Sequence, residues 1–540
     1  MQSLSIQEKV GQLIMPWLPG SYTAVNGEAF IEAAQWIERL GIGGIVISTG
    51  TPIAAASKLN SLQLRSRLPL IVTADFEFGV AMRMSGATAF PQPMAIGATG
   101  RELDAYQLGR ITAIEARAIG VHWTFSPVAD LNSNPDNPII NTRSFGETPG
   151  RVAPLISAYI RGASDYGLFT TAKHFPGHGD TGVDSHIALP VLAACWERLD
   201  SLELAPFRSA IAAGVTSIMT AHVALPCIDD GENLPATLSA RIMRTVLGDS
   251  LGFRGIVVTD ALTMGAIVST YGIGESAVQA FLAGSDVLLY PSDPFEAFYA
   301  TVAAVRSGRI PAERLDHSVR KLLNLKEQAG LFERRTVPLD SVTSFVGIRA
   351  HTLIAEDIAA RSLTLVQEGA LNAFRNRRSR VAVVTYAEET NLRIGNTMVR
   401  HLRDLGDTVS TFRIFPASGP LSYDSASVLI AQHGRVIFAT SVRAVSGRGH
   451  IALPSLLADL IQRTNRATPT VLVSFGSPYL LRQIGAFDGT FILAWTDVDP
   501  AERAVAFALS GGAPITGQLP ISLSPTMVRG HGITVPAENR

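Results

Sequence analysis

Short apolar runs rich in β-branched residues recur along the first part of the chain, and stretches with helical periodicity separate most of them. The runs are residues 41–48, 68–75, 121–130, 168–174, 216–223, 254–261 and 285–291. Strands buried on both faces that alternate with helices indicate parallel β/α units. Seven or eight such units over about 320 residues favour a (β/α)8 barrel, and a doubly wound open sheet is the competing arrangement.

Polar side chains at the ends of these runs separate the two arrangements. Each side chain falls at or just after the carboxyl end of a predicted strand, and the set is Asp75, Asp130, Lys173, His174, His222 and Asp260. In a barrel all such ends open onto one face, where the active site lies, whereas an open sheet spreads them along an edge. The sequence therefore predicts an α/β fold with an N-terminal TIM-like barrel.

A second block follows a stretch without clear periodicity, residues 333–347. From about residue 350, apolar runs again alternate with helical segments, which predicts a smaller α/β (αβα) sandwich. We expect a catalytic barrel over 1–335, a linker over 336–360 and a C-terminal domain over 361–540. The second block contains neither GxGxxG nor GxxxxGKS, so we expect no phosphate loop and no chemistry there.

Composition excludes several classes of partner. The chain has 45 basic and 46 acidic residues, which argues against nucleic acid and an anionic membrane surface. No apolar run approaches the roughly 18 residues of a membrane helix. Glu8 and Lys9 interrupt the place where a signal peptide needs its apolar centre. We expect a monomer or weak dimer, cytoplasmic if Met1 is native and periplasmic or extracellular if an export signal has been removed.

The cysteine content predicts neither a disulfide framework nor a thiolate zinc site. Only Cys195 and Cys227 occur in the chain. Two cysteines are too few for either arrangement, so the sequence predicts two buried apolar thiols.

The stretch KHFPGHGDTGVDSH, residues 173–186, concentrates groups that transfer protons. Asp184 and His186 are two residues apart, so in an extended segment they point to the same side. A carboxylate so placed fixes the imidazole tautomer and raises its pKa, giving a general acid/base near neutrality. The alternative is a surface loop with incidental charges, but its three glycines are typical of a loop that approaches another element closely or moves.

Two other chemistries draw on the same residue types. His174 and His178 are four apart, as in a zinc pair, but Pro176 and Gly177 between them exclude the helix that would align them with Asp180 and His186. A serine hydrolase would need a GxSxG elbow, which the sequence lacks. We therefore expect neither a metal nor another cofactor.

Asp260 follows a run of apolar and small residues that predicts a buried strand. A carboxylate there is costly unless it is hydrogen-bonded or used, although capping a following helix is an alternative role. Its position on the same face as the histidine loop favours use. One carboxylate nucleophile with one acid/base group is what retaining glycoside hydrolysis requires.

Four stretches together resemble the bacterial β-N-acetylglucosaminidases of glycoside hydrolase family 3. They are residues 90–100, 137–146, 173–186 and 257–267. The resemblance covers the whole first domain, and the C-terminal half resembles the sandwich of two-domain members, ending in a similar GQLPISL. The histidine loop is specific to this branch, since the β-glucosidases of the family lack it and often take their acid/base carboxylate from the second domain.

The resemblance implies a role for individual residues. Asp260 would be the nucleophile and His186 the acid/base, oriented by Asp184. The sugar hydroxyls would be bound by Asp75, Arg83, Arg143, Lys173 and His174. The sequence departs from the family pattern at Phe78, where a glycine is usual, and at Val80, where an arginine is usual, so the groups near Asp75 that could contact a sugar differ from those of the family.

The resemblance implies removal of terminal β-linked N-acetylglucosamine from peptidoglycan fragments or chitin oligosaccharides. A β-glucosidase or mixed-specificity exo-glycosidase is the alternative. A glycoside phosphorylase using the same site is a second alternative, because imidazole is neutral after protonating the leaving group and does not repel phosphate. A sugar-binding relative without activity is disfavoured, because a binder needs neither Asp260 nor the Asp184–His186 pair.

Overall fold

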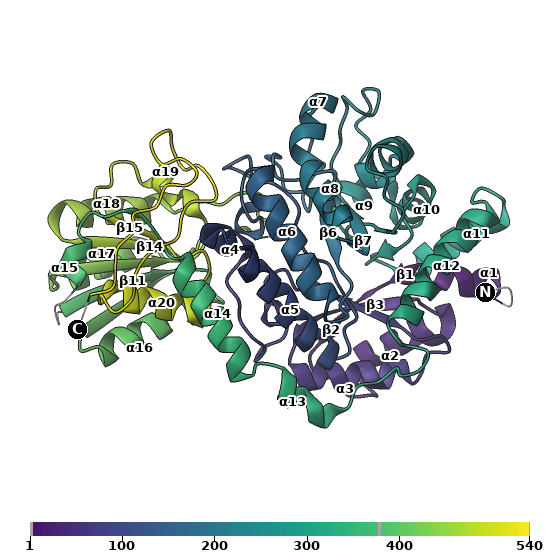
Figure 1. Cartoon of the computed structure of the whole chain (residues 1–540), viewed down its shortest axis with the longest axis horizontal. Coiled ribbons are helices and arrows are strands. Elements are labelled where there is room, and N and C mark those ends of the chain that lie inside the picture. The colour runs from purple at the N-terminus through teal and green to yellow at the C-terminus, as the bar shows by residue number, and fades with distance from the viewer. Residues whose placement is uncertain (1–3, 376–379, 446, 539–540) are drawn as a thin grey trace. The chain divides into compact units, whose positions relative to one another are not determined.

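The computed structural model describes residues 4–375, 380–445 and 447–538 (Figure 1). The chain forms two compact units, and neither is one continuous segment. The first contains the chain up to Thr88, Ala105–Leu131 and Val152–His351. The second contains Ala89–Asp104, Asn132–Arg151 and the chain from Thr352 onward. Two of the stretches that carry the family resemblance, residues 90–100 and 137–146, therefore belong to the second unit.

The first unit is built from parallel strands, and every predicted apolar run in it overlaps one. The strands are β1 (Ile14–Met15), β2 (Trp17–Gly20), β3 (Gly44–Gly50), β4 (Ile71–Ala74), β5 (Trp123–Thr124), β6 (Thr171–Phe175), β7 (Ser217–Thr220), β8 (Ile256–Val258) and β9 (Leu288–Leu289). They form a sheet β2-β3-β4-β5, a sheet β6-β7-β8 and a pair β1-β9. The prediction of an α/β fold with parallel strands is confirmed, while β1 and β2 were not predicted.

Single parallel bridges continue these sheets beyond the named strands. Trp123 at β5 pairs with Phe169, just before β6, and Val258 at β8 pairs with Val287, just before β9. Strands β4, β6, β7 and β8 consist entirely of buried residues. Continuous burial is what the unbroken apolar runs predicted, because helices cover parallel strands.

Helices separate the strands of this unit. Those of eight residues or more that lie wholly within it are α2 (Glu28–Gln35), α3 (Pro52–Gln63), α8 (Ala205–Ala212), α10 (Ile273–Ala283), α11 (Pro294–Arg306) and α12 (Ala312–Gln328). The start of helix α11 is fixed by two residues. Pro294 occupies the first helical position, and the Asp293 carboxylate accepts hydrogen bonds from the N–H groups of Phe295 and Glu296 at 2.8 and 3.2 Å. The helix packs against α10 (Figure 1).

The second unit contains one six-stranded sheet in the order β10-β15-β14-β13-β11-β12. The strands are β10 (Thr364–Gln367), β11 (Arg380–Tyr386), β12 (Thr408–Ile414), β13 (Arg435–Thr440), β14 (Thr470–Ser474) and β15 (Thr490–Leu493). All neighbours are parallel except β10, which is antiparallel to β15. Connections through helices are what parallel neighbours require.

Each face of this sheet carries its own apolar core. Along β11, Ala382 and Val384 face one core, whereas Val381 and Val383 face the other. The first core includes residues of α17 (Pro420–Ala431) and α18 (Ser455–Ala467), and the second includes residues of α16 (Asn396–Asp404) and α20 (Asp499–Leu509) (Figure 1). Helix α4 (Pro93–Thr99) supplies Met94, Ala95 and Ala98 to the first core.

The prediction of two buried thiols is wrong. Cys195 and Cys227 are both exposed and form a disulfide across a sequence separation of 32 residues. The bond joins the end of the segment that follows β6 to the loop after β7. The number of cysteines alone could not predict the bond, because the bond depends on these two segments lying close together in the fold.

Among the described helices, none has the length and hydropathy needed to cross a bilayer.

The disulfide gives a direct prediction about thiol content. Protein unfolded in denaturant without reductant should show no group that reacts with a thiol reagent, and prior reduction should reveal two. Closing a loop of about 30 residues stabilises the folded state by about 4 kcal/mol, so reduction should also lower the unfolding midpoint. Two reactive thiols in the unreduced, unfolded protein would contradict the bond.

Candidate active site

The carboxyl ends of β4, β6 and β8 bring together most of the predicted polar residues. Asp75 follows the last residue of β4, Lys173 and His174 lie within β6, and Asp260 lies two residues after β8. Parallel strands present their carboxyl ends at the same edge, so these side chains converge although they are far apart in sequence.

Lys173 is paired with two carboxylates. Its Nζ lies 2.8 Å from Asp75 Oδ1 and 2.7 Å from Glu77 Oε1, and its side chain is 3% exposed. Arg83 NH2 lies 3.3 Å from the other oxygen of Asp75. Burial opposes ionisation of Asp75, but Lys173 and Arg83 hold the pKa of its carboxyl below the usual value. Asp75 is thus a carboxylate, which accepts hydrogen bonds from hydroxyl groups.

His174 is fixed by Asp130. Its Nδ1 lies 2.7 Å from Asp130 Oδ2, and Asp130 also accepts the backbone N–H groups of His174 and His178 at 3.1 and 2.7 Å. Burial opposes ionisation of Asp130, but the His174 and His178 rings and these hydrogen bonds lower the pKa of its carboxyl. An acceptor at Nδ1 places the proton on that nitrogen and sets the orientation of the ring.

Asp184 and His186 are in contact. Oδ1 of Asp184 lies 2.8 Å from His186 Nδ1 and accepts the backbone N–H of His186 at 2.9 Å. The Asp184 side chain is fully buried, whereas the His186 side chain is 35% exposed. A buried carboxylate therefore holds an accessible imidazole with its second nitrogen directed away from the pair.

Asp260 is ionised by its surroundings. Burial opposes ionisation, but the His174 and His222 rings, the N–H of Ala261 at 2.7 Å and Lys173 lower the pKa of Asp260 to about 2. The electrostatic neighbours of His222 include Asp260, His186 and His174. The predicted nucleophile and the predicted acid/base thus belong to one electrostatic cluster.

Close backbone contacts position the loop that carries His186. A Cβ atom on Gly265, the first residue of α9 (Gly265–Tyr271), would lie 2.9 Å from the carbonyl oxygen of His186 and 3.1 Å from that of Ile187. On Gly179 a Cβ would overlap the carbonyl oxygen of Leu131. The loop therefore packs directly on the segment that follows Asp260, and glycine permits both approaches.

His178 holds the same loop from within. Its Nδ1 lies 2.7 Å from Thr181 Oγ1 and its Nε2 lies 2.9 Å from Ser185 Oγ. Burial lowers the pKa of His178 to about 4, so the ring is neutral and donates from one nitrogen while accepting at the other.

The described part of the chain contains no group of three or more histidine, cysteine, aspartate or glutamate side chains placed so that they could hold a metal ion.

Arg143 lies at the end of a short helix, Asn141–Arg143, in the second unit, where its NH1 donates to the Ile139 carbonyl oxygen at 3.0 Å. Val80 is 1% exposed. The family arginine at that position is therefore replaced by a buried apolar group, and Val80 presents no polar atom to a ligand.

Sequence reasoning missed the supporting partners. Asp130 and His222 were singled out as strand-end residues, but nothing in the sequence linked Asp130 to His174 across a separation of 44 residues. Glu77 was not among the predicted site residues. Its position two residues after Asp75 was the available signal, because alternate residues of an extended segment share a side.

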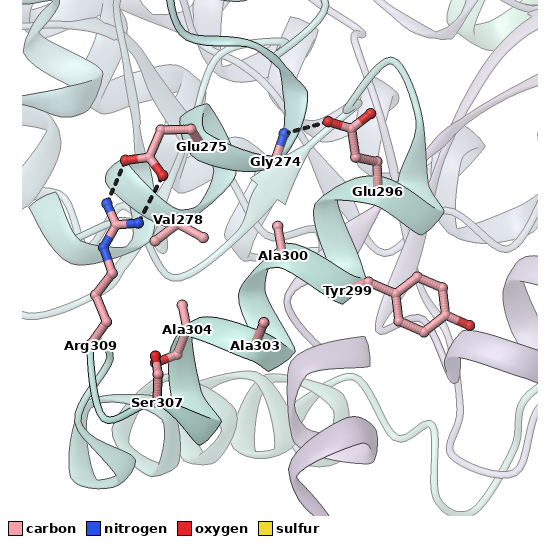
Figure 2. Close-up of a pocket in the computed structure, with 10 residues that line it drawn as sticks. All are labelled: Gly274, Glu275, Val278, Glu296, Tyr299, Ala300, Ala303, Ala304, Ser307 and Arg309. Carbon is pink, nitrogen blue, oxygen red and sulfur yellow. Dashed lines mark hydrogen bonds and ion pairs between the residues drawn. The ribbon is translucent and has the colours of Figure 1, made fainter.

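A separate cavity of about 670 Å³ lies between α10 and α11 (Figure 2). Ala300, Ala303 and Ala304 line it, and an ion pair between Glu275 and Arg309 closes one side. The lining contains none of the predicted site residues, so this cavity is not the candidate active site.

Comparison with known proteins gives the family. Residues 5–325 match the family described as glycosyl hydrolase family 3, N-terminal domain. The chain therefore belongs to glycosyl hydrolase family 3.

Relatives match well beyond that domain. The chain is 30% identical over 502 residues to a β-N-acetylglucosaminidase/β-glucosidase of Cellulomonas fimi, covering 89% of this chain and 88% of that protein. It is similar to the structure of a family 3 β-N-acetylglucosaminidase from Paenibacillus sp. FPU-7, with a TM-score of 0.85, 33% identity and coverage of 97% and 99%. A β-glucoside phosphorylase bound to 2FGlc superposes with a TM-score of 0.86 at 26% identity, covering 97% of this chain and 95% of that one.

The contact between Gly265 and the His186 backbone predicts the effect of one methyl group. Gly265→Ala should displace the loop and lower kcat/KM by about 10- to 100-fold, since a shift of about 1 Å in a catalytic group has effects of that size. The matched control is Gly150→Ala, where nothing lies within 4 Å of the added Cβ. Equal activity of both variants and wild type would show that the loop position does not depend on this contact.

The low pKa of Asp260 predicts how the rate of intermediate formation changes at acid pH. Because the pKa is lowered to about 2, the carboxylate is lost only as the pH falls towards that value. With an aryl glycoside whose leaving group needs no protonation, the rate of intermediate formation should stay constant down to about pH 3. Stopped-flow measurement, with circular dichroism to verify folding, tests this. A decline centred near the ordinary aspartate value of about 4 would contradict it.

Proposed function

We propose that the protein is an exo-acting retaining glycoside hydrolase that removes terminal β-linked N-acetylglucosamine. The observation that carries the proposal is the Asp184–His186 pair, held on a loop that packs on the segment following Asp260. The names of the Cellulomonas and Paenibacillus relatives support the same activity. Peptidoglycan fragments and chitin oligosaccharides contain this terminal sugar.

The fold proposed for the first unit is a closed (β/α)8 barrel. Its support is the set of parallel bridges that link β5 to the start of β6 and β8 to the start of β9, together with the pairing of β9 with β1. The C-terminal block forms the sandwich of this proposal. The proposed divisions along the chain are 1–335, 336–360 and 361–540, with two inserts of the first division, 89–104 and 132–151, joining the second compact unit.

The proposed reaction has two steps. First, Asp260 attacks the anomeric carbon while His186 gives the proton on its outer nitrogen to the departing oxygen, which leaves a glycosyl ester on Asp260. The imidazole, now neutral, then takes a proton from water, and the water oxygen displaces Asp260 from the anomeric carbon. Asp184 keeps Nδ1 protonated throughout and stabilises the imidazolium form.

Sugar recognition is proposed to use the charged cluster at the strand ends. Asp75 would accept hydroxyl hydrogens, and Lys173, His174, Arg83 and Arg143 would donate to hydroxyl oxygens. The two ion pairs of Asp75 hold its carboxylate in place, and a pre-positioned group loses little entropy on binding.

The proposed nucleophile predicts a large and specific loss. Asp260→Ala should fold and yet lose activity by at least about 10⁴-fold, because it removes the covalent step. With wild-type enzyme, NMR should show the β-anomer of the sugar first, since two inversions retain configuration. A variant that keeps a tenth of wild-type activity, or early release of the α-anomer, would contradict the assignment of Asp260 as the nucleophile.

The proposed substrate class predicts a preference between two chromogenic substrates. The N-acetylglucosaminide should be cleaved faster than the matching glucoside. The reverse ratio would favour the β-glucosidase alternative.

A second candidate function is phosphorolysis, which the similarity to a β-glucoside phosphorylase favours. The neutral imidazole after the first step does not repel an anion. In millimolar phosphate the glycosyl ester should then yield a sugar 1-phosphate. A non-nucleophilic buffer at matched ionic strength is the control. Free sugar as the sole product at every phosphate concentration would leave hydrolysis as the reaction.

The compartment is proposed from the disulfide. Disulfides persist in oxidising environments and are rare in a reducing cytoplasm. The exposed Cys195–Cys227 bond therefore favours an exported protein, periplasmic or extracellular. Fractionation of the source cells tests this, and activity confined to the cytoplasm would contradict it.

A further inference from the structure

The sheet of the second unit reverses its direction of growth between β11 and β13. From β11 the chain moves to β12 on one side and then returns to β13 on the other, after which β14 and β15 continue outward. At such a reversal the two connections leave in opposite directions, and the gap between them at the carboxyl ends of the strands is where ligands bind in open α/β sheets.

A cavity of about 250 Å³ lies at this place. Tyr386 is the last residue of β11 and Ser441 follows the last residue of β13, and both line it. Glu388, Arg443 and Arg448 add charged groups. Ile451 and Leu453 add an apolar wall.

The charges of the cavity are balanced in pairs. Arg448 lies 2.6 and 2.5 Å from the two carboxylate oxygens of Glu388. Arg443 NH1 lies 3.3 Å from Asp497, and Asp497 also accepts hydrogen bonds from Ser441 Oγ and Asn391 Nδ2 at 2.8 and 2.7 Å. Each guanidinium faces a carboxylate, so the cavity offers donors and acceptors without a strong net charge, which disfavours an anionic ligand.

A nucleotide phosphate is disfavoured for a second reason. In folds of this kind, phosphates bind at the N-terminus of the helix after the first strand. Here that helix is α16, and the Glu502 carboxylate already accepts the N–H groups of Gly395, Thr397 and Met398 at 2.7, 2.8 and 3.1 Å. A built-in carboxylate thus occupies the place of a phosphate.

Tyr386 supplies the observation that points to a ligand. The residue is 6% exposed and lines the cavity, and its hydroxyl makes no hydrogen bond to another described residue. Burial and the neighbouring Glu388 raise the pKa of Tyr386 to about 12, so the hydroxyl keeps its proton. The hydroxyl is not sealed from solvent, so it faces the cavity, where a ligand hydroxyl can replace water as its hydrogen-bond partner.

We propose that this cavity binds one sugar unit of a neutral saccharide. Paired guanidinium and carboxylate groups match the adjacent hydroxyls of a sugar, Tyr386 adds one hydrogen bond, and Ile451 and Leu453 pack against the C–H face of the ring. The choice of an N-acetylglucosamine oligosaccharide as the probe rests on the proposed function, whereas the class of ligand rests on the cavity.

The test is calorimetric titration of the full chain carrying Asp260→Ala with tri-N-acetylchitotriose. Two binding events are expected. Adding Tyr386→Phe should weaken one of them about five- to tenfold, the worth of one hydrogen bond. Adding Tyr423→Phe is the matched control, because Tyr423 is equally buried in the same core and does not line the cavity. That variant should bind like its parent.

Three outcomes would overturn the proposal: one binding event only, no effect of Tyr386→Phe, or equal weakening by Tyr423→Phe. Displacement of the saccharide by millimolar phosphate from the event that depends on Tyr386 would also overturn it, because the site would then be an anion site. In the otherwise wild-type enzyme, Tyr386→Phe should leave kcat/KM for an aryl monosaccharide within about twofold. Turnover of that substrate by wild type tests the proposed function separately.

Discussion

The ammonium group of Lys173 lies almost buried between the carboxylates of Asp75 and Glu77, and the candidate active site depends on that placement. Removing one member of a buried ion pair typically costs about 3–5 kcal/mol, because it leaves an uncompensated charge. Lys173 also lowers the pKa of Asp260. Lys173 therefore supports two proposed functions. It holds carboxylates in place to accept sugar hydroxyls, and it helps to keep the nucleophile ionised before substrate binds.

Local spacing in the sequence predicted part of this site. Asp184 and His186 were expected to meet because they are two residues apart, and their side chains lie 2.8 Å from each other. The strand ends were also predicted from the sequence, since β4, β6 and β8 overlap predicted apolar runs. The catalytic roles of these residues stay predictions.

Interactions between segments far apart in the sequence could not be predicted from it. Asp130 holds His174 from 44 residues away, and neither residue type nor spacing indicates the pair. The cysteines were misassigned for the same reason, because a bond across 32 residues depends on where two loops lie. The second unit was predicted to lack chemistry because it has no glycine-rich motif. Its cavity at the reversal between β11 and β13 arises from strand order, which periodicity does not report.

The passage of α4 into the second unit limits how this protein can be divided. Met94, Ala95 and Ala98 are buried in the core of the C-terminal sheet, although they precede most of the first unit in the chain. A gene truncated after the first unit would encode a protein with this apolar helix face uncovered, a recognised cause of aggregation. In this chain, a shuffled partner domain would have to reproduce the surface that receives α4.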